Sequence, residues 1–339
     1  MNVHLGAASG APTTSTTGVG PAIEANDLVK NYGYVTALNG LSFAVAPGTV
    51  FGLLGPNGAG KSTTIKILTT LTLPTAGSAT VAGIDVLRRP DGVRSAIGVV
   101  THRSGTDPQA TGRENLLLTG RIHGMRGTQV KDRADELLDR FGLTEAANRT
   151  VRTYSGGMQR KLDVAMGLMH RPHVLFLDEP TTGLDPQARA EMWAEINWLA
   201  AHEGLTILLT THYLEEADQL ADRLAIVDRG ELVTQGTPEQ LKSELRGDAV
   251  VTEVAADADL AAARSAIERV ATTREVSIDG QVVRARVDHG GSAVPAVLAA
   301  LETVRASVAS ITVARPSLDD VYLQHTGRTF AAAEEGENR

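Results

Sequence analysis

The sequence predicts an α/β protein with a mostly parallel sheet, followed by a smaller α+β unit. Over residues 23–242, short apolar runs alternate with amphipathic stretches, which is the pattern of strand–helix repeats around such a sheet. A glycine-rich loop within this region stands between an apolar run and a helical pattern. Beyond about residue 243 the order changes to β-α-β-β-α-β, a ferredoxin-like plan.

Composition excludes several classes of function. The 339 residues carry a formal net charge of −8, which argues against a nucleic-acid partner. There are 0 cysteines, so thiolate metal sites and cysteine nucleophiles are excluded. Residues 35–60 are uncharged, but glycines and prolines interrupt them, so we expect no membrane span there. If the protein works at a membrane, a partner must supply the membrane part.

The stretch GPNGAGKST, residues 55–63, predicts a phosphate-binding loop. An apolar run over residues 50–54 predicts the preceding buried strand, and residues 61–71 predict the following helix. Lys61 would reach the β- and γ-phosphates, and the Ser62 hydroxyl would hold Mg²⁺. Residues expected to contact the nucleotide are Gly55, Pro56, Asn57, Gly58, Ala59, Gly60, Lys61, Ser62 and Thr63. The alternative is an ordinary glycine turn between a strand and a helix.

The stretch VLFLDE, residues 174–179, predicts a buried strand that ends in two carboxylates. Downstream of a phosphate-binding loop, Asp178 at a strand end can hold Mg²⁺. Glu179 can polarise the attacking water as a general base. Adjacent acids can also mark a helix start, but Pro180 and the lack of a helical pattern disfavour that alternative.

Two further stretches complete the candidate site. In YSGGM, Ser155, Gly156 and Gly157 open a predicted helix, whose exposed N–H groups form a second anion site. We expect this turn to serve the γ-phosphate of another subunit; the alternative is a helix entry without ligand. In TILLTTH, a buried strand ends in His212, which could orient Glu179 near the γ-phosphate or could be a structural histidine.

In this order, the motifs resemble those of ATP-binding-cassette (ABC) transporter ATPase subunits. Within that superfamily the chain resembles the daunorubicin/doxorubicin-resistance ATP-binding subunits of antibiotic exporters, over residues 23–240 and more weakly to residue 327. GPNGAGKST matches the Walker A motif, VLFLDE the Walker B motif and YSGGM the signature motif. TTGLD, with Asp185, matches the D-loop, and His212 the switch histidine. NYG places Tyr32 where an aromatic stacks on adenine, with Tyr34 as a competing candidate.

The chain departs from the family pattern at two positions. The signature ends in Met158 in place of glutamine. In IGVVTHRSG, His102 stands where the family's Q-loop has a metal-contacting glutamine, although another register would bring in Gln109. Because Mg²⁺ prefers oxygen ligands and imidazole titrates near pH 6.5, we expect weakened metal contact and pH-dependent coupling.

Composition and pattern predict a disordered tail (residues 1–22), an α/β domain (23–242), an accessory domain (243–328) and a solvated tail (329–339). The resemblance implies that residues 23–242 are a nucleotide-binding domain with a helical subdomain (about 105–170). The resemblance also implies an ATPase that uses ATP and Mg²⁺ and works as a head-to-tail homodimer. At the cytoplasmic face of the cell membrane, the dimer would drive a separate permease, of ABC-2 type, that exports an amphipathic drug or lipid-like compound. The accessory domain would extend the dimer contact or regulate it.

Two other classes remain to be distinguished. A soluble ABC-type ATPase without transport is the first, although the chain has neither a coiled-coil insertion nor a second cassette. The second is a nucleotide-gated binding module without turnover, against which Glu179 and His212 argue.

Overall fold

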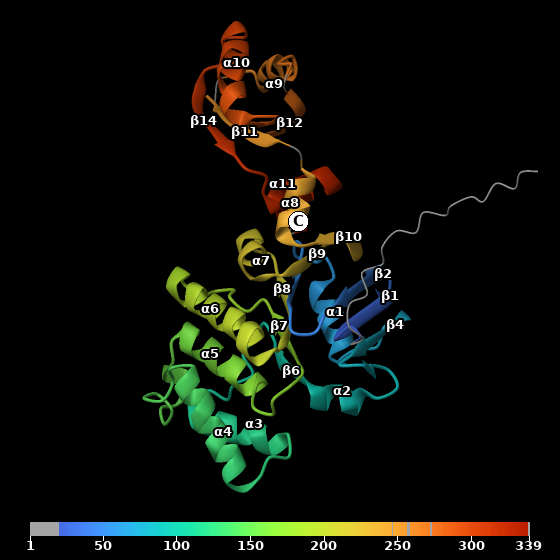
Figure 1. Ribbon diagram of the computed structural model, residues 1–339, viewed down its shortest axis with the longest axis vertical. Helices are drawn as coiled ribbons and strands as arrows, with labels where there is room; N and C mark the ends of the chain where they lie inside the picture. The colour runs from blue at the N-terminus through green and yellow to red at the C-terminus, as the bar shows by residue number, and fades with distance from the viewer. Residues whose placement is uncertain (1–19, 246, 256–257, 272, 338–339) are drawn as a thin grey trace, which may run out of the picture.

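The computed structural model describes residues 20–245, 247–255, 258–271 and 273–337, and it stands as two units one above the other (Figure 1). Most of the predicted N-terminal tail, residues 1–19, lies outside the described residues. The lower unit contains the phosphate-binding stretch and the upper one contains the ferredoxin-like stretch.

The lower unit is built on a six-stranded sheet in the order β10-β9-β3-β8-β7-β6. Its strands are β3 (Val50–Leu54), β6 (Ile97–Val100), β7 (Val174–Asp178), β8 (Thr206–Thr211), β9 (Arg223–Asp228) and β10 (Glu231–Gly236). Five of them pair in parallel and β10 pairs antiparallel with β9 at the edge. The predicted α/β fold class is therefore confirmed, and strands such as VFGLL are buried along their whole length, as parallel strands covered on both faces must be.

The two faces of this sheet carry different layers. On β7, Leu175 and Leu177 face the core shared with α5 (Gly156–Gly167) and α6 (Pro186–Glu203). Val174 and Phe176 face the opposite core, shared with α1 (Lys61–Leu68) and an antiparallel sheet. That second sheet has the order β2-β1-β4-β5, with β1 (Ile23–Tyr32), β2 (Val35–Val45), β4 (Ala76–Val81) and β5 (Ile84–Asp85). The helix after the phosphate loop and the helix after the signature turn thus lie on opposite faces.

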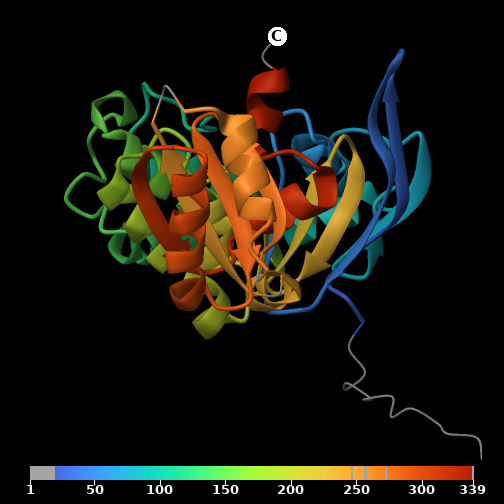
Figure 2. The ribbon, with the colours of Figure 1, turned by 90° about the horizontal axis from the view of Figure 1, so that it is seen from above.

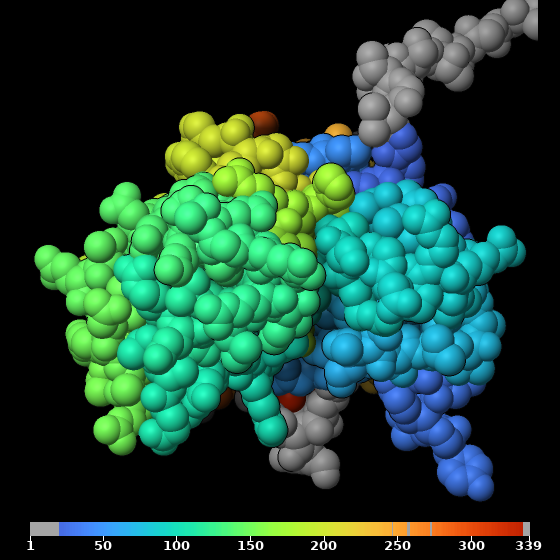
Figure 3. Space-filling model, turned by 90° about the horizontal axis from the view of Figure 1, so that it is seen from below, coloured from blue at the N-terminus to red at the C-terminus, as the bar shows by residue number. Residues whose placement is uncertain are grey.

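Three helices form a lobe at the end of the lower unit remote from the upper one (Figure 1). They are α3 (Gly112–Ile122), α4 (Gly127–Arg140) and the start of α5; the short α2 (Pro90–Ala96) and the 3₁₀ turn Val151–Thr153 precede α3 and α5. Thr111 and Glu114 form a capping box that fixes the start of α3. Figure 3 shows the outer face, where this lobe (green) stands beside the segment around α2 and β4 (cyan). Leu118 and Ile122 of α3 are 56% and 74% exposed.

The upper unit has the ferredoxin-like order that the sequence predicts. Its elements are β11 (Asp248–Val254), α9 (Leu260–Glu268), β12 (Thr273–Asp279), β13 (Val282–Val287), α10 (Gly290–Thr303) and β14 (Val308–Ala314). The strands pair antiparallel in the order β12-β13-β11-β14, and α9 and α10 pack on one face, as Figure 2 shows. The β12–β13 turn contains Gly280 at φ 56°, the left-handed conformation for which glycine is suited.

The end of the chain differs from the prediction. Residues 329–339 were expected to be a solvated tail, but α12 (Phe330–Glu337) follows α11 (Leu318–Thr326), and Phe330 is only 4% exposed. Tyr322 and Phe330 pack against the lower unit. They share one core with Leu54 of β3, with Leu224 of β9 and with Leu241, which lies on α8 (Pro238–Glu244). The prediction of a tail was therefore wrong for α12, since a run of alanine and glutamate shows only a narrow apolar face. Similarly, α11 packs with α8 and α7 (Leu214–Leu220) of the lower unit, although its residues were assigned to the accessory domain.

Candidate functional site

The phosphate loop lies at the carboxyl end of β3, directly before α1. Gly60 holds φ 100° at the start of α1, and a Cβ there would lie 2.6 Å from the Ala37 carbonyl oxygen, so only glycine fits. At Gly55 a Cβ would lie 2.2 Å from the Val227 carbonyl oxygen. Lys61 is 5% exposed, and its Nζ donates to the carbonyl oxygens of Gly55 (2.6 Å) and Pro56 (2.9 Å). The loop thus holds its lysine inside the backbone turn that would surround a phosphate.

Two hydroxyl groups donate to one carboxylate oxygen beside this loop. The Ser62 Oγ donates to Asp178 Oδ1 at 3.2 Å, and the Thr210 Oγ1 donates to the same oxygen at 2.6 Å. These groups come from α1 and from the ends of β7 and β8, which are neighbours in the sheet; α1 contacts β7. Hydroxyl and carboxylate oxygens are the donors that suit Mg²⁺ when phosphates and water complete its shell, so Ser62 and Asp178 fit this ion. Thr210 was not singled out from the sequence, because a threonine in an apolar strand carries no signal of its own.

The Glu179 carboxylate lies beside a lysine and two histidines. Its Oε1 lies 3.2 Å from His212 Nδ1 and 4.0 Å from Lys61 Nζ. Its Oε2 lies 3.5 Å from His102 Nδ1. The contact with His212 is the main cause that holds the pKa of Glu179 below its ordinary value. The charges of Lys61 and His102 act in the same direction and burial acts against them, so this carboxylate is ionised at neutral pH.

The backbone of Glu179 is strained. Its φ is 49°, in the left-handed region that side chains other than asparagine and aspartate rarely adopt. Its N–H donates to the carbonyl oxygen of Thr210 at 3.1 Å and also lies 3.1 Å from the Thr210 Oγ1. Strain of this kind persists only where the surroundings hold it, and it concentrates at functional sites.

The signature turn opens α5 as the sequence predicts. Ser155 caps the helix by accepting from the Met158 N–H at 3.2 Å, and Gly156 and Gly157 are the first residues of the helix. The D-loop residue Asp185 caps α6 by accepting from the Ala188 N–H at 2.8 Å. Since α5 and α1 lie on opposite faces of the sheet, the signature turn and the phosphate loop of one chain face different directions.

Two alternatives from the sequence stay open. Tyr32 ends β1 with a ring that is 46% exposed, and Lys30 Nζ lies 4.8 Å from its centroid; Tyr34 in the following turn is fully exposed. Either ring is accessible to a stacking base. The Q-loop position has its contact through His102 and Glu179, whereas the backbone N–H of Gln109 donates to Asp107.

The comparisons with known proteins agree with this geometry. The ABC transporter family model matches residues 38–182, and the model for the C-terminal domain of DrrA1-3-like ATP-binding proteins matches residues 236–326. The daunorubicin resistance ATP-binding protein DrrA3 of Streptomyces coeruleorubidus is 44% identical over 306 residues, which are 90% of this chain and 96% of that protein. The chain belongs to the daunorubicin/doxorubicin-resistance family of ABC transporter ATP-binding subunits.

Other relatives place this ABC ATPase in the same group. The daunorubicin/doxorubicin resistance ATP-binding protein DrrA of Streptomyces peucetius is 43% identical over 321 residues, covering 93% of this chain and 97% of that one. A solved ATP-binding cassette, a dimer in a post-hydrolysis state bound to ADP and Pi, superposes with a TM-score of 0.59 at 25% identity, covering 63% of this chain and 98% of that one. Among the described residues of this ABC subunit, no helix has the length and apolarity needed to cross a membrane.

His102→Gln tests the charge environment of Glu179 in this ABC ATPase. The contact with His212 is the main cause that lowers the pKa of Glu179, and the charge of His102 acts in the same direction. Removal of the imidazole should therefore raise the pKa of Glu179 toward its ordinary value and move the acid limb of the ATPase pH profile to higher pH. The shift should be less than about one pH unit, the size expected for a partly exposed charge pair. ATPase profiles of His102→Gln and the wild type that coincide over the acid limb would refute the idea.

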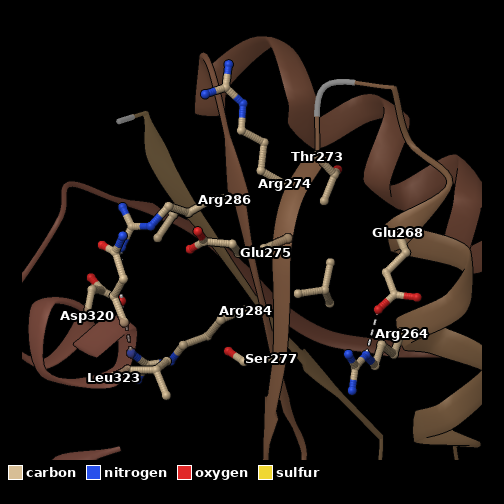
Figure 4. Close-up of a pocket in the computed structure, with 14 residues that line it drawn as sticks. Arg264, Glu268, Thr273, Arg274, Glu275, Ser277, Arg284, Arg286, Asp320 and Leu323 are labelled. Atoms are coloured by element: carbon tan, nitrogen blue, oxygen red, sulfur yellow. Dashed lines mark hydrogen bonds and ion pairs between the residues drawn. The ribbon is translucent and has the colours of Figure 1, made fainter. Parts of the chain in front are cut away.

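A cavity of about 570 Å³ lies in the C-terminal part of this ABC subunit (Figure 4). Its walls include Arg284 and Arg286 of β13 and Asp320 of α11. The guanidinium groups of these two arginines lie 3.7 and 3.6 Å from Asp320 Oδ1, and on another wall Arg264 pairs with Glu268 along α9. These three arginines are therefore ion-paired, and the cavity marks an ion-paired junction between the ferredoxin-like sheet and α11.

Proposed function

We propose that this protein is the ATP-hydrolysing subunit of an exporter, in which closure of an ATP-bound dimer drives the efflux of an amphipathic drug or lipid-like compound through a separate membrane subunit. The observation that carries the proposal is the meeting of three motifs around Glu179. Lys61 from the phosphate loop and His212 from the end of β8 lie within 4.0 Å of one carboxylate oxygen of Glu179, at the end of β7.

These residues have separate roles in hydrolysis. The loop formed by residues 55–63 and the Lys61 ammonium bind the β- and γ-phosphates of ATP. Glu179 accepts a hydrogen bond from the attacking water and takes its proton as the bond to the γ-phosphorus forms, so that ADP and phosphate leave. His212, beside Glu179, orients the carboxylate and donates to the γ-phosphate. Tyr32 supplies the ring for adenine.

Ser62 and Asp178 are the residues that would hold Mg²⁺, which neutralises phosphate charge when it is bound. His102, at the Q-loop position, is the third residue that we propose as a Mg²⁺ ligand. Its Nδ1 lies 3.5 Å from Glu179 Oε2, which supports a second influence, on the catalytic base.

The position of the signature turn supports a head-to-tail homodimer. Ser155, Gly156 and Gly157 present a capped helix start on the face of the sheet opposite to α1. In a two-fold arrangement, the signature turn and Asp185 of one copy would complete the site formed by the phosphate loop of the other. ATP would then bridge the two surfaces and favour the closed state.

The outer face of the helical lobe supports contact with a membrane partner. Leu118 and Ile122 are exposed on α3, on the lobe that Figure 3 shows at the end remote from the ferredoxin-like unit. We place there the cytoplasmic helices of an integral permease, of ABC-2 type, which would hold the subunit at the cytoplasmic face of the cell membrane. The relatives' names point to an amphipathic drug of the daunorubicin kind as cargo.

The proposal is tested by recovering tagged Glu179→Gln protein from detergent-solubilised native membranes, with and without Mg-ATP. A complex with a polytopic membrane protein that Mg-ATP stabilises is the expected result. Recovery from the soluble fraction alone, with no membrane protein under either condition, would favour a soluble ABC-type ATPase. Reconstitution of the recovered pair in vesicles with a fluorescent anthracycline would then test the cargo.

A further inference from the structure

Arg160 is a buried charge in α5 that none of the sequence motifs explains. It lies two residues beyond the signature turn, and 8% of it is exposed. A buried guanidinium is tolerated only where its N–H groups are satisfied, because desolvation of the charge is costly. Its partners therefore show what the charge is for.

The Arg160 guanidinium donates to carbonyl oxygens of two segments of the candidate site. One segment is the end of β7: Nη2 donates to Asp178 and Glu179, each at 3.1 Å, and Nε donates to Pro180 at 2.7 Å. The other is the end of β6, where Nη1 donates to the Thr101 carbonyl at 2.7 Å, directly before His102. All of these acceptors belong to the backbone, so the arginine fixes chain geometry and leaves the acidic side chains to other partners.

This geometry bears on the strained residue of the site. Glu179 adopts φ 49°, and the carbonyls on both sides of it and its own are all held by Arg160. On the opposite side, Thr210 accepts from the Glu179 N–H. A left-handed conformation is unfavourable for a non-glycine residue, and it persists where several contacts determine it together. Arg160 supplies most of those contacts.

The same helix, α5, also forms hydrogen bonds to the loop that contains His102. Asp163 Oδ1, one turn after Arg160, accepts from Ser104 Oγ at 2.9 Å and from the Gly105 N–H at 3.0 Å. Gln159 Nε2 donates to Thr106 Oγ1 at 3.2 Å. The helix that starts at the signature turn therefore holds both the catalytic strand end and the loop of His102.

We infer that Arg160 is a positioning residue for hydrolysis: it holds the Glu179 backbone in the conformation that aims its carboxylate at the water, and it ties that conformation to the signature helix. The inference rests on the proposed catalytic role of Glu179. It predicts an effect on turnover and not on ATP binding, because the four acceptors lie outside the phosphate loop.

The first test replaces Arg160 by lysine, which keeps the charge but not the planar set of donors. Misplacement of a reacting group by about 1 Å can cost about 100-fold, so Arg160→Lys should lower kcat by about 10- to 100-fold. The KM for ATP and the Kd of a fluorescent ATP analogue should change by less than about threefold. Arg160→Gln, which keeps only an amide donor, should lose at least as much. Lys161→Gln is the matched control, since Lys161 on the same helix pairs with Glu191 at the surface.

The second test is a double-mutant cycle with Glu179→Gln, measured in single-turnover assays. If Arg160 acts through Glu179, Arg160→Lys should change the residual rate of Glu179→Gln by less than about twofold. An equal fractional loss in both backgrounds, or a loss of ATP binding with kcat unchanged, would overturn the inference. So would a urea midpoint lowered in proportion to the lost activity, because that is the mark of a merely structural residue. The proposed function fails separately, if Glu179→Gln alone turns over at the wild-type rate.

Discussion

Glu179→Gln should lower the steady-state ATPase rate by about 100- to 10,000-fold, the range that a general base contributes. The amide cannot accept the proton of the attacking water, although it keeps the shape of the side chain. Lys61 and the phosphate loop are unchanged, so the Kd for ATP should stay close to that of the wild type. The two rates are compared by phosphate release at saturating ATP, and the Kd by a fluorescent nucleotide.

Two controls make this result specific. Glu215→Gln changes an exposed carboxylate at the start of α7 and should leave the rate unchanged. Gel filtration should show Glu179→Gln as a dimer with ATP and as a monomer without it, because a nucleotide that is not hydrolysed keeps the two copies together. A Glu179→Gln rate within twofold of the wild type would remove Glu179 from the mechanism.

Tyr322→Ala should lower the free energy of unfolding by about 3–5 kcal/mol, as expected when a fully buried aromatic side chain is truncated. Tyr322 is 0% exposed, and its ring meets that of Phe330 edge-on at 5.0 Å between centroids. Both rings fill the core that joins α11 and α12 to the lower unit. The two tryptophans, Trp193 and Trp198, both lie on α6, so urea unfolding followed by their fluorescence reports on this unit.

Tyr322→Phe is the matched control because it keeps the ring. Burial, and then the charge of Asp228, raise the pKa of Tyr322 to about 12, so its hydroxyl is neutral under all ordinary conditions and its loss should cost far less than loss of the ring. If Tyr322→Ala and Tyr322→Phe both unfold at the same urea concentration as the wild type, the docking of α11 and α12 does not stabilise the lower unit.

The site could be predicted from the sequence to the extent that its residues follow local patterns. Lys61 and Ser62 stand in a fixed spacing of glycines, and Asp178 and Glu179 end an apolar strand, so their types and places carry the chemistry. Arg160 could not be found in this way. Its partners are backbone carbonyls up to 59 residues away, and neither spacing nor residue type indicates them.

The fold, too, could be predicted where it depends on local patterns and not where it depends on contacts between distant parts of the chain. Alternation of strand and helix patterns predicted the parallel sheet and the ferredoxin-like order, because both depend on periodicity within short windows. The docking of α11 and α12 was missed, since it depends on a surface formed by α7, α8 and β9, far back in the chain. A helix as short as α12 is stable in water only through such packing, and the sequence shows only two of its apolar contacts, Phe330 and Ala333.

The packing of α8 against α11 brings together the two points where the chain enters and leaves the ferredoxin-like unit. The chain leaves the lower unit after α8, forms the ferredoxin-like unit and returns to the lower unit at α11. The helices α8 and α11 contact each other. In topological terms it is an insertion, with its entry and exit held side by side, and not an appendage on a single tether. Such a unit can be exchanged for another module of closely spaced ends without breaking the core of its host. The junction is therefore a natural place to graft a fluorescent reporter, or to ask what the ATPase does when the inserted unit is replaced by a short loop.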